Sequence, residues 1–296
     1  MSDDADPTHY QLTFRSAMDR MGNDPELFAY LQVLRVDGAT GRAIMVVNRE
    51  GGDLPGRPVG LFATTLKKEQ VQALGAAIEA VKWSDTGSMK GGDITSATLT
   101  IDYARGARLI QRSFSATNGQ LINAISGAMD PITELMQTLH SHPARAIDVA
   151  VVQGPSGFKL VIRNVGTGPV VIADPRHPGK DGASTCGWVG AARDVPPPPG
   201  SGPIPLQPVG FPPLGTAPPL VTIPAGKSIE VDTVAWKPLG AGKYFARGNW
   251  QDYGPVSGDP KAFLPLVPDA AGFEHDGRPY RIRGAAFSKA LFFAVR

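Results

Sequence analysis

The chain has 296 residues and a formal net charge of +2, with 42% hydrophobic and 19% charged residues. This length is sufficient for two ordinary domains, each with its own hydrophobic core. The basic residues are spread along the chain, so the composition argues against nucleic acid as the main partner. No apolar run reaches the ~18–20 residues that a membrane-spanning helix needs.

The N-terminal sequence is acidic and polar and lacks the basic and hydrophobic regions of a signal peptide. Two compartments stay open: the protein is cytoplasmic, or it is a mature extracytoplasmic segment in which Met1 replaces a removed signal. The high glycine and proline content slightly favours the second. The single cysteine, Cys186, excludes an internal disulfide framework.

The first predicted elements are a β-hairpin and a helix. Residues 27–37 and 41–50 are apolar runs joined by a glycine-containing turn, which is the pattern of a hairpin. Residues 10–16 are a candidate for an additional strand before it. A helix is predicted over residues 65–83, with Thr65 as its N-cap and apolar residues at helical spacing.

A second hairpin and a second helix follow. Residues 94–104 and 107–116 alternate between polar and apolar and predict two strands. The helix is expected from about Asn118, its cap, to about residue 140, with a buried apolar stripe. Pro131 lies inside this helix and should kink or divide it.

The order of these elements predicts an α+β domain over residues 1–143. Two ββα units suggest an antiparallel sheet with both helices on one face. Pro143 marks the boundary, because helices end before proline. From residue 144 to residue 296, short apolar strands recur roughly every ten residues between Gly/Pro turns, the pattern of a β-sandwich. A proline-rich insert, residues 195–224, interrupts them and is expected to be extended coil on the surface.

Three short motifs characterise the second half: Asn-x-Gly at a strand end, Pro-x-Gly before a strand, and Gly-x-Tyr in a late strand. They are formed by Asn164 and Gly166, by Pro224 and Gly226, and by Gly242 and Tyr244. With these motifs, residues 146–296 resemble a bacterial immunoglobulin-like sandwich, as found in intracellular proteinase inhibitor domains and cell-adhesion modules. The resemblance implies an all-β Ig-like domain, but a fold does not by itself imply a function.

The stretch Gly242–Gly254 contains four aromatic residues and is the main candidate for a binding site. Alternation along a strand places Phe245 and Arg247 on one side and Tyr244 on the other. Tyr244 follows a Gly-rich turn in the form of a tyrosine corner, so a structural role is expected for it.

These features predict a non-catalytic protein that binds another protein, such as a bacterial antagonist or immunity protein, an inhibitor, or an envelope-associated binder. Sandwich domains carry function on their end loops. Trp250 and Tyr253 are expected in a turn after the strand, where they could form an aromatic tip. The predicted binding residues are Trp250, Asp252, Tyr253, Phe211 and Arg247.

Two other classes of function remain open. One is a metal-dependent enzyme that uses the loops at residues 174–181 and 274–276. Its candidate ligands are Asp174, His177, His275 and Asp276. The other is a structural subunit that uses the proline-rich insert as a contact arm. No phosphate-binding loop or serine nucleophile motif is present, so no cofactor is predicted.

Overall fold

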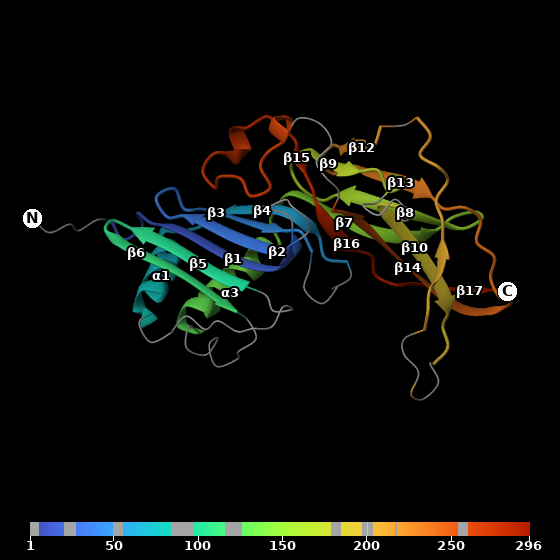
Figure 1. Ribbon diagram of the computed structural model, residues 1–296, viewed down its shortest axis with the longest axis horizontal. Helices are drawn as coiled ribbons and strands as arrows, with labels where there is room; N and C mark the ends of the chain where they lie inside the picture. The colour runs from blue at the N-terminus through green and yellow to red at the C-terminus, as the bar shows by residue number, and fades with distance from the viewer. Residues whose placement is uncertain are drawn as a thin grey trace, which may run out of the picture. The chain divides into compact units, whose positions relative to one another are not determined.

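The computed structural model describes residues 6–20, 28–49, 56–83, 98–115, 126–178, 185–196, 200, 204–216, 218–253 and 260–296 (Figure 1). The described residues are mostly β, with 48% in strands and 14% in helices. Its contacts divide it into two compact units. Unit 1 consists of Met1–Asn48, Gly60–Ala144 and Pro260–Arg278, and unit 2 of Arg49–Val59, Arg145–Asp259 and Pro279–Arg296.

Unit 1 contains an antiparallel arrangement of six strands. They are β1 (Gln11–Arg20), β2 (Phe28–Asp37), β3 (Arg42–Val47), β4 (Val59–Thr65), β5 (Thr98–Arg105) and β6 (Arg108–Ser115). Their order is β4-β3-β2-β1-β5-β6, and each pair of neighbours is antiparallel. The predicted hairpin is confirmed as β2 and β3, with Gly41 in the left-handed region at φ 71°.

Two α-helices of unit 1 pack against one face of these strands. They are α1 (Lys68–Ala80) and α3 (Ser126–Leu139). The phenol of Tyr10 donates to the main-chain oxygen of Val71 at 2.8 Å, and the phenol of Tyr103 donates to Glu79 Oε1 at 2.6 Å. Both bonds fix α1 against the sheet. The described part of this unit also holds the 3₁₀ helices η2 (Pro260–Ala262) and η3 (Phe273–His275).

The prediction of two ββα units is wrong, because four strands precede α1. The strand β4 was missed: its sequence VGLFATT has no polar–apolar alternation, and its first four residues are all buried. Buried strands read as continuous apolar runs, which periodicity does not separate from a helix start. Thr65 ends β4 and does not cap α1. The cap is Lys67, whose N–H donates to Gln70 Oε1 at 2.9 Å.

The second helix is undivided from Ser126 to Leu139 although Pro131 lies inside it. The predicted cap, Asn118, lies outside the described residues. Neither of the two described helices has the length and hydrophobicity to span a bilayer.

Within the described residues, the regular elements of unit 2 are all strands. They are β7 (Pro143–Gln153), β8 (Phe158–Asn164), β9 (Val170–Ala173), β10 (Gly187–Arg193), β11 (Gln207–Val209), β12 (Leu220–Ile223), β13 (Ser228–Asp232), β14 (Gly242–Asp252), β15 (Tyr280–Arg281), β16 (Gly284–Phe287) and β17 (Leu291–Val295). Strand β8 lies between β13 and β7, and β9 lies between β12 and β15. Another sheet has the order β11-β10-β14-β16, with β17 also paired to β14.

An Ig-like sandwich after an α+β domain is therefore not the fold of this chain. The β9–β15 pair is parallel and β9–β12 is antiparallel, so these strands form a small mixed sheet of their own. The short motifs specified turns and strand starts, whereas the order of the strands depends on pairings between distant segments. The predicted insert also holds two strands, β11 and β12, each at the edge of its sheet where proline is tolerated.

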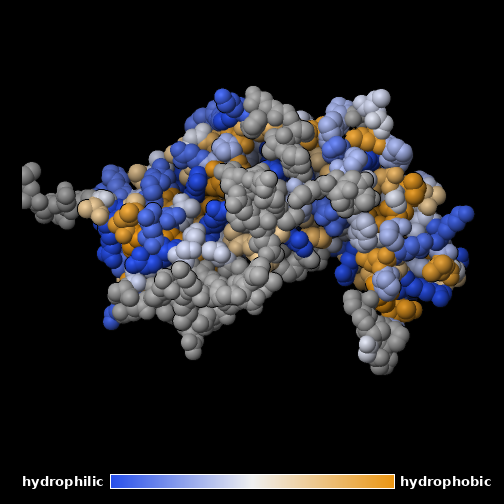
Figure 2. All heavy atoms as spheres, viewed as in Figure 1, coloured by the Kyte–Doolittle hydropathy of each residue, from blue (hydrophilic) through white to orange (hydrophobic). Residues whose placement is uncertain are grey.

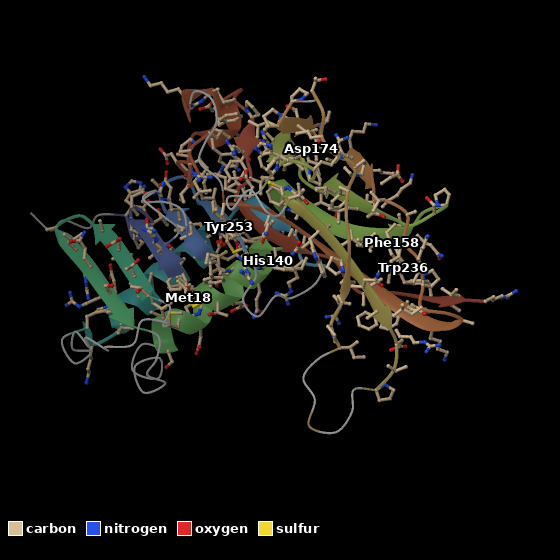
Figure 3. The ribbon with its side chains drawn as sticks, turned by 45° about the vertical axis from the view of Figure 1, so that its right-hand side comes forward. Met18, His140, Phe158, Asp174, Trp236 and Tyr253 are labelled. Atoms are coloured by element: carbon tan, nitrogen blue, oxygen red, sulfur yellow. The ribbon has the colours of Figure 1, made fainter. Side chains whose placement is uncertain are left out.

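An aromatic cluster forms part of the core of unit 2. The rings of Phe158 and Trp236 lie side by side, with centroids 5.4 Å apart (Figure 3). Tyr244 on β14 lies 5.2 Å from Trp236 and 5.9 Å from Phe293 on β17. Edge-to-face and offset pairs of this kind add stability beyond the area that they bury. They tie β14 and β17 to the neighbouring strand β8.

Candidate functional site

Strand β14 divides its side chains between two faces. Tyr244, Ala246, Trp250 and Asp252 are buried, whereas Arg247 is exposed. This period of two is the expected geometry of a strand with one face against the core. The predicted separation of Tyr244 from Phe245 and Arg247 is confirmed, and the two faces of β14 have to be considered separately.

Tyr244 has the structural role that its position predicted. Its phenol donates to the main-chain oxygen of Gly240 at 2.8 Å, which braces the turn that leads into β14. The ring lies in the aromatic cluster described above and is 2% exposed.

Trp250 does not form an exposed tip. The strand continues to Asp252 because β10 and β16 pair with it along this length. The Trp250 side chain is fully buried at 0% exposure, and its indole N–H donates to the main-chain oxygen of Ala173 at 2.9 Å. The polar residue Asn249 suggested a turn, but it lies in the strand opposite Phe287. In this structure Trp250 therefore stabilises the core.

Asp252 forms a buried ion pair. Its Oδ2 accepts a hydrogen bond from Arg281 Nη2 at 2.9 Å, and both side chains are almost completely shielded from solvent. The thiol of Cys186 lies near by. Burial, and secondarily the negative charge of Asp252, raise the pKa of this thiol to about 12. Cys186 is therefore protonated at neutral pH, which is unfavourable for a nucleophile.

The remaining predicted binding residues lie in different environments. Tyr253 is half-buried at the end of β14. Phe211 is also half-buried and lies against Gly187 of β10, where an added Cβ would meet its ring at 3.1 Å. Only Arg247 among the five is exposed, so the structure does not gather them into one surface.

The outer face of β10, β14 and β17 presents a different group of side chains, which we call the aromatic face. It consists of Trp188, Phe245, Arg247 and Phe292. Phe245 and Phe292 lie directly opposite each other across β14 and β17, with ring centroids 6.1 Å apart. Phe292 is 65% exposed, which is uncommon for so large an apolar side chain. Hydrophobic surface is visible over the part of unit 2 that holds these strands (Figure 2).

Arg247 completes this face with a positive charge. Its Cζ lies 5.7 Å from the centre of the Phe245 ring, within the range of a cation–π contact. Such a contact orients the guanidinium while leaving its N–H groups able to bind an acceptor. The only acidic residue on these three strands is Asp252, which is buried on the other side.

Gly190 makes room for the indole of Trp188. A Cβ at position 190 would lie 2.5 Å from Cζ2 and Cη2 of Trp188, so the ring lies against the backbone of its own strand. Gly190 is paired with Arg247, and the indole therefore extends beside that position. The sequence offered one signal for this arrangement: Gly190 inside an apolar run, because a glycine within a strand often marks a position that another group approaches closely.

The candidate metal loops hold their carboxylates in ion pairs with arginine. In unit 2, the carboxylate of Asp174 accepts hydrogen bonds from Arg176, from Nε at 2.9 Å and from Nη2 at 2.8 Å. In unit 1, Asp276 accepts from Arg278, and these side-chain and main-chain hydrogen bonds lower its pKa to about 2. Each of the two loops thus contains an Asp-x-Arg sequence in which the aspartate and the arginine pair with each other.

No metal-like group of three or more His, Cys, Asp or Glu residues lies within the part of the chain that the structure describes. His177 and His275 belong to the same two loops as these ion pairs. The geometry of the described residues gives no positive support to the alternative of a metal-dependent enzyme.

Comparison with known proteins gives no further assignment. No protein-family model matches the chain, and no curated protein matches its sequence. Its function therefore has to be argued from the residues themselves.

Proposed function

We propose that this chain is a non-catalytic protein-binding protein that contacts its partner through the aromatic face of unit 2. The observation that carries the proposal is the 65% exposure of Phe292 beside Phe245. Arg247 lies over the ring of Phe245. Exposed aromatic residues next to arginine are the residue types that dominate the binding energy of protein interfaces.

A partner that covers these rings would gain binding free energy. Burying one aromatic side chain of this kind contributes about 2 kcal/mol, and a desolvated cation–π contact adds about 1–2 kcal/mol. The backbone that carries the rings is held by the pairing of β14 with β10 and β17. Less conformational entropy is then lost when a partner binds.

Charge indicates which kind of partner fits. Arg247 is exposed on β14, and the three strands themselves carry no carboxylate on this side. Asp194 follows β10 beside Lys243, where its N–H donates to the Lys243 main-chain oxygen at 2.9 Å, so Arg247 supplies the positive charge of this face. We expect a partner segment that combines acidic and apolar side chains, because electrostatic complementarity gives specificity and fast association.

The test uses the substitutions Phe292→Ser and Arg247→Ala in the full chain. The matched control is Leu109→Ser, because Leu109 is 63% exposed but lies in unit 1. The partner is first identified by affinity capture from the native cell and then purified for direct titration.

The expected result is that each aromatic-face substitution weakens binding of the purified partner about tenfold or more, while Leu109→Ser has no effect. A partner that binds all three variants with equal affinity would show that the aromatic face is not its binding site. Thermal unfolding of each variant verifies that the substitutions leave the fold intact.

A further inference from the structure

Strands β1, β2, β5 and β6 of unit 1 have a helix side, which faces α1 and α3. The opposite side of the same strands is called the second face here. Leu12 and Phe14 of β1 point to the helix side and are buried. The alternate residues Thr13 and Arg15 point the other way and are only half-buried. At these positions of β1 the second face is therefore polar and the helix side is apolar.

The residues on this face form rows across the strands. In one row Arg35 of β2 lies opposite Thr13 of β1, which lies opposite Asp102 of β5, which in turn lies opposite Gln111 of β6. Residues paired in this way share a face of the sheet. Arg35 and Asp102 are thus two strands apart, about 10 Å between their backbones.

A groove of about 560 Å³ lies over these rows. Its volume falls within the range of small-molecule sites, roughly 300–1,000 Å³. Val267, from the segment between η2 and η3, forms part of its wall. Beside it, Leu266 packs with Ala17, Leu31 and Val33 into a small hydrophobic cluster, so one end of the groove is apolar.

Arg35 is held in place at the same end. Its Nη1 donates to the main-chain oxygens of Val267 and Pro268, each at 3.1 Å. These two bonds use both hydrogens of Nη1. Within the described ranges its Nε and Nη2 have no protein acceptor, so the edge that presents two parallel N–H groups stays available. This edge matches the two oxygens of a carboxylate.

The other charged residues of the groove fit a single anionic group. Arg15 adds positive charge, and Asp102 is the one acidic residue among those that line it. Two arginines against one aspartate favour an anion. Asp102, about two strands from Arg35, disfavours a ligand with several negative charges spread along its length.

We propose that this groove is a binding site for a small organic carboxylate with a short apolar portion. The carboxylate binds the Nε–Nη2 edge of Arg35. The apolar portion lies against Leu31, Val33 and Val267, and Thr13 and Thr100 offer hydroxyl groups for any further polar atoms of the ligand. This site is independent of the aromatic face of unit 2.

Hexanoate serves as the probe, because it has one carboxylate and a short apolar chain. Hexanamide is the matched neutral compound of the same shape. Saturation-transfer NMR with the full chain measures the dissociation constant of each. We expect hexanoate to bind in the millimolar range or more tightly and hexanamide at least ~10-fold more weakly, since a hydrogen bond to a charged group is worth more than a neutral one.

Substitutions of groove residues test whether hexanoate binds in the groove. Arg35→Gln should weaken hexanoate binding about tenfold, and Arg35→Lys should restore only part of it because lysine lacks the two-pronged donor edge. Arg15→Gln is the second variant: Arg15 lines the groove from the same side of β1 as Thr13 and is only half-buried, and glutamine keeps much of its length. It should weaken binding about threefold.

Arg108→Gln is the matched control. The guanidinium of Arg108 donates to the main-chain oxygen of Glu79 in α1 at 3.1 Å, and Arg108 does not line the groove. It should not change hexanoate binding. Asp102→Asn should strengthen binding about twofold, because it removes a repulsive charge at a screened distance.

Three outcomes would overturn the proposal. They are no binding of hexanoate at about 20 mM, equal binding of hexanamide, and hexanoate binding that is unchanged in both Arg35→Gln and Arg15→Gln. The substitution Phe292→Ser in unit 2 should leave hexanoate binding unchanged, so failure of the aromatic-face proposal and failure of this one are separate results.

Discussion

The inner and outer faces of β14 are made by alternate residues of one strand, and they differ in what surrounds each aromatic ring. Tyr244 and Trp250 on the inner face are enclosed by other strands, and each donates its polar hydrogen to a main-chain oxygen. Phe245 on the outer face has a neighbouring ring and a guanidinium but is still partly exposed. An aromatic residue in this strand therefore stabilises the fold on one side and is available for binding on the other.

The comparison also explains why clustering of aromatic residues along the sequence was a poor guide to a site. Trp250 and Phe245 are five positions apart, so they fall on opposite sides of the strand. Residues that are remote in sequence, such as Trp188 and Phe292, share the outer face because β10 and β17 both pair with β14.

The largest expected effect contrasts a ring on each face. Trp250→Ala should lower the free energy of unfolding by about 3–5 kcal/mol, because it leaves a cavity and removes the donor to the Ala173 oxygen. Phe245→Ala should lower it by about 1 kcal/mol or less, since that ring is only half-buried. Urea denaturation followed by circular dichroism measures both. Equal losses would show that the two faces do not differ in the way described.

The next effect compares two ion pairs of equal length. Arg281–Asp252 in the core and Lys159–Glu230 on the surface both have N–O distances of 2.9 Å. Asp252→Ala should cost about 3 kcal/mol, because Arg281 is left buried without its counter-ion. Glu230→Ala should cost less than about 1 kcal/mol, because water solvates the remaining charge.

The double substitution Asp252→Leu with Arg281→Met refines the same comparison. It should be less destabilising than Asp252→Ala, since no buried charge remains without a partner. A double variant that is less stable than the single one would mean that the pair contributes more than the cost of its own desolvation. Denaturant unfolding at fixed pH provides the measurement.

The smallest expected effect concerns the pH dependence of stability. Burial raises the pKa of Cys186 from 9.0 to about 12 in the folded protein. Above about pH 9 the thiol loses its proton in the unfolded chain but keeps it in the folded protein, which favours unfolding. The contribution of the protonated Cys186 thiol to stability is therefore fully present below about pH 9 and is lost as the pH rises from about 9 to about 12. Between pH 8 and pH 10 the wild type should lose about 1 kcal/mol more than Cys186→Ala does. Parallel pH curves of the two proteins would contradict the assignment.

Several local features could be predicted from the sequence because they depend on short-range physics. The β2–β3 hairpin needed a glycine with positive φ at its turn, and Gly41 provides it. The apolar spacing of α1 predicted the burial of Val71, Leu74 and Ile78. Alternation along β14 predicted which side each residue occupies, and the turn before Tyr244 predicted the hydrogen bond of its phenol.

The failures share a different origin. The strand β4 was hidden because a strand buried on both faces has no alternation, and its identity as a strand depends on pairing with β3. The end of β14 was misplaced because polar residues near Trp250 suggested a turn, whereas pairing with β16 continues the strand. In both places a partner strand from elsewhere in the chain overrode the local sequence preference.

The sequence by itself determined the turns, the helix of unit 1 that follows β4, and the alternation of side chains on each strand, because these depend on residues a few positions apart. The tertiary structure decided which of those side chains meet. The aromatic face gathers residues of three strands between Trp188 and Phe292, and the groove gathers β1, β2, β5 and β6 with Val267. Hydrogen bonds between distant strands bring these residues together, and their pairing depends on the packing of each whole unit rather than on any short stretch of the chain.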